Sequence, residues 1–272
     1  MVASAPTAVL APFVEGYVGY RLQGFPAGEH RGLPSRHMTF IVSIGPGIDV
    51  TSHTDPTQAP GTYGCVLGGL QATPATISHG GHQEGVTIEL SPLGSRVLLG
   101  MPARALWNQT VECADVAGPA GRELWERLQG PAPWADRFAV CDDVLRRLAR
   151  PGVDLAPELR VAWRALVTSG GATPVGEVAR EVGWSRQHLA RRFGEEFGLR
   201  PKLAARVLRF ERASRLLRAG TGAGTIAEVA AACGYFDQSH LDRDFAELAG
   251  CAPTVWLAEE VPSVQDELAT VV

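Results

Sequence analysis

The last third of the chain contains an internal repeat, and this feature constrains the fold more than any other. Glu177-Val178-Ala179 recurs 51 positions later as Glu228-Val229-Ala230. Further matches pair Gly183-Trp184 with Gly234-Tyr235, His188-Leu189 with His240-Leu241, Arg191 with Arg243, Phe193 with Phe245, Glu195 with Glu247, Gly198 with Gly250 and Pro201 with Pro253. So many matches in register predict two units with the same local structure.

Each copy has the pattern of a helix, a glycine-aromatic turn and a second helix. Ser185 and Asp237 precede the second helices, where short polar side chains cap the first turn. One side of these helices is mostly apolar, with Leu189, Phe193 and Glu196/Phe197 in the first copy, and Leu241, Phe245 and Leu248 in the second. The opposite side carries Gln187, Ala190, Arg191 and Gly194, and then Ser239, Asp242, Arg243 and Ala246. Small residues permit close approach, and Arg and Gln can read base edges bidentately, so the pattern favours helices that enter DNA major grooves.

The charge distribution agrees with a polyanionic partner, although the net charge of the whole chain is −4. Residues 180–218 contain 11 basic and four acidic side chains, which gives this window a net charge of 11 − 4 = +7. A local positive field, rather than the global sum, attracts nucleic acid. The alternative is an ordinary helical bundle with an arginine-rich solvated face.

Residues from about 155 to 258 resemble the DNA-binding domain of AraC/XylS-type transcriptional regulators. The residues that carry the resemblance are Val178-Ala179, Gly183, His188-Leu189, Arg191, Phe193, Gly198 and Pro201, and then Val229-Ala230, Gly234-Tyr235, Asp237-Gln238, His240-Leu241, Arg243, Phe245, Gly250 and Pro253. The resemblance implies seven helices, with Pro201–Ala219 as a linker helix between two helix-turn-helix units. It also implies double-stranded DNA and RNA polymerase as partners, a possible second copy of the chain, and a role such as transcriptional activator.

The same resemblance assigns roles to individual residues. Base readers would be Gln187, Ala190 and Arg191 in the first unit and Gln238, Ser239, Asp242 and Arg243 in the second, with Arg186 and Arg192 nearer the phosphates. Asp242 and Asp244 depart from the basic pattern, because acids close to phosphates weaken binding. We therefore expect the first unit to supply most of the binding energy.

The amino-terminal half has a different texture, with short β-prone segments between Gly- and Pro-rich turns. The expected strands are Val14–Leu22, Met38–Ile44, Tyr63–Gly68, Ala75–His79 and Val86–Leu90. This spacing predicts a small β-barrel or sandwich, and its position before such a DNA-binding module resembles the family's cupin-like sensor domains. The helices that follow, with Trp125, Trp134 and Phe138, could form a dimer face or pack on the barrel.

We therefore predict a two-domain α+β protein. The expected units are a ligand-sensing or dimerisation domain over residues 1–152, a DNA-binding domain over 153–258, and an acidic flexible tail over 259–272. The boundary is placed at Pro151-Gly152, which breaks the helical pattern.

Other classes of protein are less well supported. The five cysteines are scattered without a Cys-x-x-Cys motif, the first basic residue is Arg21, and no apolar run reaches the length of a membrane span, so we expect a cytoplasmic protein without membrane contact. The histidines His79 and His82 form a cluster with Glu84, but the full ligand set of a metal cupin is absent. We expect no enzyme activity, metal or other cofactor. The alternative function is a ligand-binding barrel, or a cupin-type metalloenzyme, whose degenerate DNA module acts through protein partners.

Overall fold

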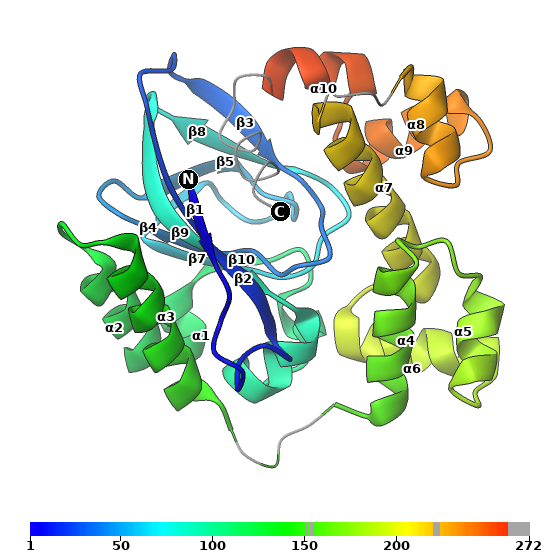
Figure 1. The fold of residues 1–272 in the computed structure, drawn as a ribbon, viewed down its shortest axis with the longest axis horizontal. Coiled ribbons are helices and arrows are strands. Elements are labelled where there is room, and N and C mark those ends of the chain that lie inside the picture. Colours follow the sequence, from blue (N-terminus) through cyan, green and yellow to red (C-terminus); the bar gives the residue numbers. More distant parts are fainter. Residues whose placement is uncertain (151, 153–154, 220–223, 261–272) are drawn as a thin grey trace.

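The strands of the amino-terminal half form two antiparallel sheets (Figure 1). The computed structural model describes residues 1–150, 152, 155–219 and 224–260. One sheet has the strand order β1 (Val2–Ser4), β2 (Val14–Gln23), β9 (His82–Leu90), β4 (Phe40–Ser43), β7 (Cys65–Gly68) and β10 (Thr110–Glu112). The other has the order β3 (Gly28–Gly32), β8 (Ala75–His79), β5 (Ile48–Ser52) and β6 (Gly61–Tyr63).

The expected cupin-like barrel is not found. Among the described strands, β1 and β10 each pair with one neighbour only, so they remain edges of the larger sheet and do not close it. The five expected strands lie within or close to β2, β4, β7, β8 and β9, while the short or polar strands β1, β3, β5, β6 and β10 were not predicted. The two-sheet alternative describes the structure better.

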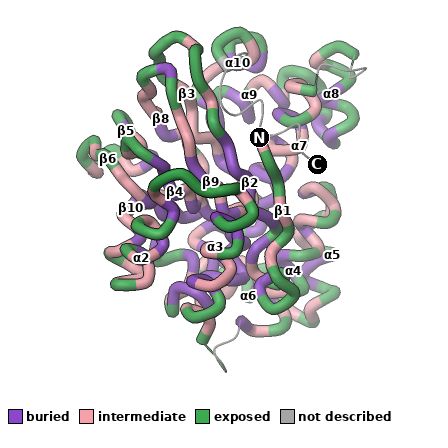
Figure 2. Tube along the Cα trace, turned by 60° about the vertical axis from the view of Figure 1, so that its left-hand side comes forward, coloured by how far each residue is buried: buried purple, intermediate pink, exposed green. Residues whose placement is uncertain are grey.

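The two faces of the larger sheet have different neighbours because side chains alternate along a strand. On β2, Tyr17 and Gly19 face the helices that follow the sheet, whereas Tyr20 faces the smaller sheet across a cavity. The residues of the helix-facing side belong to the main hydrophobic core: Tyr17, Phe40, Val42, Cys65, Leu67, Val86 and Ile88. Figure 2 shows buried positions concentrated in this region, while β3 and β6 are exposed or half-buried.

The helices after the sheet pack on this face, which is one of the two roles left open for their aromatic residues. α2 (Pro119–Leu128) and α3 (Trp134–Leu148) follow the short helix α1 (Cys113–Ala117). The ring of Phe138 stacks on Tyr17 with centroids 6.0 Å apart, and Trp134 fills the space that a side chain at Gly19 would need. Trp125 lies against Gly64 in the same way. These residues therefore pack within the subunit.

The carboxyl-terminal half is helical, and its two repeats bury separate sets of residues. The helices are α4 (Pro157–Thr168), α5 (Val175–Glu181), α6 (Arg186–Phe197), α7 (Pro201–Ala219), α8 (Ile226–Ala232), α9 (Gln238–Leu248) and α10 (Pro253–Glu260). The apolar side chains of α4, α5 and α6 join the core of the amino-terminal half, whereas α8, α9, α10 and the second half of α7 enclose a core of their own. Figure 1 shows α7 running between the two repeats.

Two of the predicted boundaries fall near residues outside the described part of the chain. The domain break at 152/153 lies among residues 151, 153 and 154, and the tail over 261–272 is also outside. Residues 259 and 260, predicted as the start of the tail, continue helix α10. Within the described ranges, no helix has both the length and the apolar character needed to cross a bilayer.

Candidate nucleic-acid interface

The two helix-turn-helix units repeat each other in their local interactions. The Ser185 side chain accepts a hydrogen bond from the His188 amide at 3.2 Å, and Asp237 accepts one from the His240 amide at 2.7 Å. Gly183 and Gly234 turn the chain with φ of 71° and 77°, values that favour glycine. The aromatic residue after each glycine contacts the histidine of the following helix edge to face, with centroids 4.7 Å apart in the first unit and 5.1 Å in the second.

The second helix of each unit buries one side and exposes the other, as its pattern predicts. Leu189, Phe193 and Phe197 are buried in α6, and Leu241, Phe245 and Leu248 are buried in α9. Of the predicted DNA-contacting residues, Arg186, Gln187, Arg191, Gln238, Ser239 and Arg243 are exposed, and Ala190, Arg192 and Asp242 are half-buried. The structure thus places the predicted contacts on the outward faces of two helices.

The arginines of α6 already have a local acidic partner. Arg191 donates to Glu195 at 2.8 Å and Arg192 approaches the same carboxylate at 3.3 Å. Exposed pairs of this kind contribute little to stability, at about 0.3–0.5 kcal/mol when they lie four residues apart on a helix. A phosphate or base edge can therefore replace Glu195 at small cost.

Arg186 at the start of α6 lies across the first turn of α5. A Cβ at Gly176 would come within 2.6 Å of the Arg186 guanidinium. Because Gly176 has no side chain, the Arg186 guanidinium can lie beside the first turns of both α5 and α6. Amide groups at helix starts attract phosphate, so this position suits a backbone contact.

Asp244 does not face outward, which corrects one premise of the sequence analysis. Its side chain is buried, and Arg206 on α7 donates to it from Nε at 3.0 Å and from Nη2 at 2.7 Å. The same guanidinium also bonds Glu247. Only Asp242 remains as an acid on the outward side of α9 among the two that were named, so the field of the second unit is less unfavourable than expected.

An ion pair that the sequence did not reveal holds the inner side of α6. Glu196 is only 5% exposed, and its carboxylate accepts hydrogen bonds from Arg96 at 2.8, 2.9 and 2.8 Å. Arg96 belongs to η2 (Ser95–Leu99), a helical turn of the amino-terminal half. The one available signal was the position of Glu196 on the apolar side of the helix, because a buried acid requires a partner.

The amino-terminal half contacts the second unit as well. Arg36 approaches Glu211 on α7 at 3.8 Å, and Arg31 forms an ion pair with Glu259 on α10. Leu33, which follows β3, packs against the core of the second unit. Both helix-turn-helix units are therefore docked on the β-rich half.

The candidate metal ligands of the β-rich half, His79, His82 and Glu84, lie in three different environments. Glu84 pairs with Arg21 at 2.8 Å and with Arg137 at 2.7 Å, and these hydrogen bonds hold the pKa of its carboxyl below the usual value. His82 is exposed at the start of β9, while the His79 ring stacks on His30 with centroids 5.6 Å apart. In the described part of the chain, no group of three His, Cys, Asp or Glu side chains is arranged to hold a metal ion.

The fold and this site define a two-domain α+β protein whose helical half carries two helix-turn-helix units. Residues 159–259 match a family model described as a helix-turn-helix domain. The HTH-type transcriptional regulator Rv1931c of Mycobacterium tuberculosis is 29% identical over 136 residues, which are 50% of this chain and 49% of that relative. The chain thus matches about half the length of this curated relative.

Solved structures extend the similarity to the whole fold. ToxT from Vibrio cholerae is 15% identical, with 89% of this chain and 97% of that chain covered and a TM-score of 0.51. Apo ToxT K231A is 12% identical over the same shares of the two chains, with a TM-score of 0.52. These likenesses show a common fold. Together with the family match, they confirm an AraC-type helix-turn-helix domain over residues 159–259, as the repeat predicted, in a chain that shares the fold of ToxT.

Proposed function

We propose that this protein is a sequence-specific, DNA-binding transcriptional regulator. The observation that carries the proposal is the pair of capped helices, α6 and α9, which expose Arg and Gln on the sides opposite their buried stripes. Recognition helices with such faces lie in the major groove, and two units on one rigid linker reach grooves about 34 Å apart. One monomer would then contact roughly two turns of one face of the duplex.

Phe236 adds a candidate contact that the sequence analysis did not name. It directly precedes the cap Asp237 and is 93% exposed, although large aromatic side chains are usually buried. At the entrance of α9, its ring would meet the DNA together with Gln238. Apolar contact with a thymine methyl group is a known way to read a base, and Phe can supply it.

A binding titration of the full chain tests the proposal. A selected cognate duplex and a random duplex are compared at several salt concentrations for the wild type, Arg191→Ala and Arg186→Ala. Arg191→Ala should cost about 1–3 kcal/mol of binding free energy on the cognate site. Arg186→Ala should weaken binding to both duplexes and lower the slope of log affinity against log salt concentration by about one. Arg164→Ala, at an exposed arginine of α4, is the matched control. Binding that ignores both α6 substitutions would instead favour a degenerate DNA module that works through protein partners.

We also propose that a small molecule bound in the amino-terminal half modulates DNA binding. A cavity of about 170 Å³ lies between the two sheets of this half. ToxT structures with an unsaturated fatty acid or with a naphthalenyl butenoic acid, at TM-scores of 0.50, support the idea that a chain of this fold can hold an organic ligand. The partners RNA polymerase and a second copy of the chain stay predictions of the family resemblance.

A further inference from the structure

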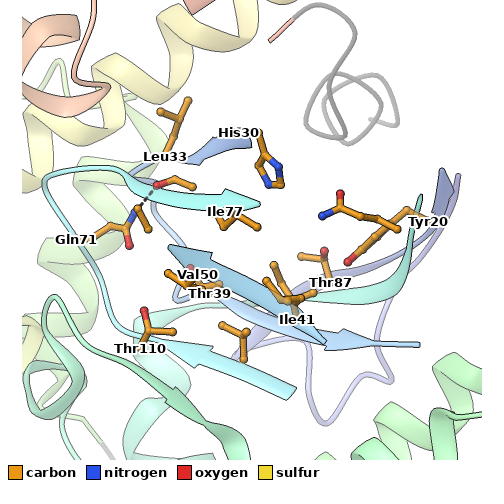
Figure 3. Close-up of a pocket in the computed structure, with 15 residues that line it drawn as sticks. Tyr20, His30, Leu33, Thr39, Ile41, Val50, Gln71, Ile77, Thr87 and Thr110 are labelled. Carbon is orange, nitrogen blue, oxygen red and sulfur yellow. Dashed lines mark hydrogen bonds between the residues drawn. The ribbon is translucent and has the colours of Figure 1, made fainter. Parts of the chain in front are cut away.

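The cavity between the sheets contains several polar atoms whose bonding capacity is unused. Within the described residues, His30 Nδ1, Gln83 Oε1 and Thr87 Oγ1 are buried without a hydrogen-bond partner, and all three residues line this cavity. Figure 3 shows His30 on the β3 side, with Tyr20 and Thr87 across from it on the larger sheet. An unpaired buried polar group costs about 1–3 kcal/mol, so three around one space indicate that something else completes them.

Much of the remaining lining is apolar. Ile41, Val50 and Ile77 supply apolar surface, and the Gln71 side chain donates to the Gly32 carbonyl at 2.7 Å. The lining in the described structure contains no Asp, Glu, Lys or Arg. Burial and the nearby His79 lower the pKa of His30 to about 4, so the ring is neutral at pH 7. The cavity therefore has no counter-charge for an ionised ligand.

From these observations we infer that the cavity binds a compact, uncharged organic molecule with a hydrogen-bonding group at its edge. The inference rests on the proposed effector control and names its ligand class. An apolar cavity of about 150 Å³ can hold benzene, so the interior of this space, about 170 Å³, suits roughly one ring. A carboxylate would lose its hydration without gaining a partner charge, which is unfavourable by several kcal/mol in an apolar site.

The cavity shares a wall with the second helix-turn-helix unit. Leu33 lines the cavity and also packs against the core formed by α8, α9 and α10. Ala72, the neighbour of the lining residue Gln71, packs against the same core. Arg31, on the strand that carries His30, pairs with Glu259 of α10. A ligand that moves the end of β3 therefore changes how the second unit is docked, and with it the spacing of the two recognition helices.

Matched pairs of probes test the ligand class on the full chain. Benzyl alcohol is compared with benzoate, and cyclohexanol with cyclohexanecarboxylate, by calorimetry and by thermal unfolding. The alcohols should bind and raise the Tm, and the carboxylates should bind about tenfold more weakly or less well still. Equal or tighter binding of the carboxylates, or no binding by either alcohol at millimolar concentration, overturns the inference.

Substitutions of the residues that carry the unpaired atoms give a second test. The stability of the ligand-free protein should stay the same or rise, while the affinity for the ligand should fall. Thr87→Val keeps the shape and removes the hydroxyl, so the ligand-free protein should melt at the same or a higher temperature, while alcohol binding weakens about three- to tenfold. Gln83→Met should weaken binding similarly. Thr62→Val, at an exposed threonine of β6 outside the cavity, should leave binding unchanged. A lower Tm for ligand-free Thr87→Val would show that the hydroxyl is already bonded, and unchanged affinity in both variants would place the ligand elsewhere.

DNA titrations run beside these measurements separate this inference from the proposed function. If the unliganded protein binds its cognate duplex and an alcohol changes that affinity, both stand. Modulation by carboxylates alone would keep effector control and refute the ligand class. Failure to bind DNA under any condition would refute the regulator itself, whatever the cavity binds.

Discussion

Arg96 in the amino-terminal half and Glu196 on the first recognition helix form a bidentate ion pair, with Arg96 Nε and Nη2 each 2.8 Å from a carboxylate oxygen of Glu196. Glu196 is buried on the inner side of α6, directly behind the face that carries Arg191. Trp107 lies against Gly198, where the same helix ends. The orientation of the first recognition helix is thus fixed from behind by the β-rich half.

Removing one partner of this pair should destabilise the protein. Arg96→Ala leaves the Glu196 carboxylate buried without its donors, and we expect the free energy of unfolding to fall by about 1–3 kcal/mol. Chemical denaturation of the full chain measures this change. Arg104→Ala, at an exposed arginine of the neighbouring turn η3 (Ala103–Leu106), should change stability by less than about 0.5 kcal/mol. Equal effects of the two substitutions would contradict the role given to the pair.

Alanine substitutions at two glycines with positive φ distinguish the cost of backbone strain from the cost of a steric clash. Gly183 has φ of 71° and open space around it, so Gly183→Ala should cost about 1–2 kcal/mol from the left-handed backbone alone. Gly198 has φ of 84°, and a Cβ there would lie 2.7 Å from Trp107 Cβ. Gly198→Ala should therefore cost about 2–4 kcal/mol, because overpacking adds to the strain. Comparing both variants by denaturation checks the difference, and a smaller loss at Gly198 would show that Trp107 moves aside freely.

The helices could be predicted closely because each has a complete local signal. The predicted linker helix Pro201–Ala219 has the bounds of α7, and α6 and α9 begin directly after the predicted caps Ser185 and Asp237. The pattern also predicted which sides of α6 and α9 are exposed.

The features that the sequence analysis missed or predicted wrongly depend on interactions between distant parts of the chain. Strand β3, with the sequence Gly28-Glu-His-Arg-Gly32, has little β propensity and is held by pairing with β8. Asp244 looked like a surface acid because its partner Arg206 lies on another helix, and Arg96 is 100 residues from Glu196. Whether a sheet closes likewise depends on which edge strands pair, and the spacing of strands along the chain does not determine this. The unpaired polar atoms of the cavity could not be predicted either, because the cavity forms only where distant strands meet.

Acid should weaken the contact of Glu15 on β2 with Arg36 and His37, which lie between β3 and β4. Although burial alone would raise the pKa of Glu15, hydrogen bonds and charges from His37 and Arg36 outweigh it and lower the pKa from 4.5 to about 2. A folded-state pKa below the unfolded value means that Glu15 contributes stability above pH 4.5, and this contribution is lost as the pH falls toward about 2. We expect about 1 kcal/mol, because Glu15 is partly exposed to solvent.

The measurement is stability against pH for the wild type and Glu15→Gln. The variant should be less stable at pH 7, and its curve should be flatter between pH 4.5 and about 2. Glu126→Gln, at an exposed acid of α2, serves as the control and should leave the curve unchanged. Parallel curves for wild type and Glu15→Gln would mean that this carboxylate has the same pKa in both states.

The two aspartates of α9 provide a matched test of which face meets DNA. Asp242 is half-buried on the outward side, whereas Asp244, two residues later, is buried against Arg206. Asp242→Asn removes a negative charge from the proposed interface, so affinity for random duplex should rise about two- to tenfold, with little change in stability. Asp244→Asn leaves the Arg206 guanidinium without its buried partner, so the free energy of unfolding should fall by about 1–3 kcal/mol, with no gain in DNA affinity.

Asp242→Asn, combined with substitutions of Arg191 and Arg243, also tests how the units share the binding energy. With Asp244 turned inward, Asp242 is the one acid of these two that still weakens the second unit, and we attribute the expected difference between Arg191 and Arg243 to that charge. Arg191→Ala should therefore exceed Arg243→Ala in its cost on the cognate site in the wild-type background, and the two costs should converge within about 0.5 kcal/mol when Asp242→Asn is also present. Anisotropy titrations of the four variants on one cognate duplex measure both differences. If Arg243→Ala is the more damaging in the wild-type background, the second unit dominates and the charge of Asp242 is not what limits it.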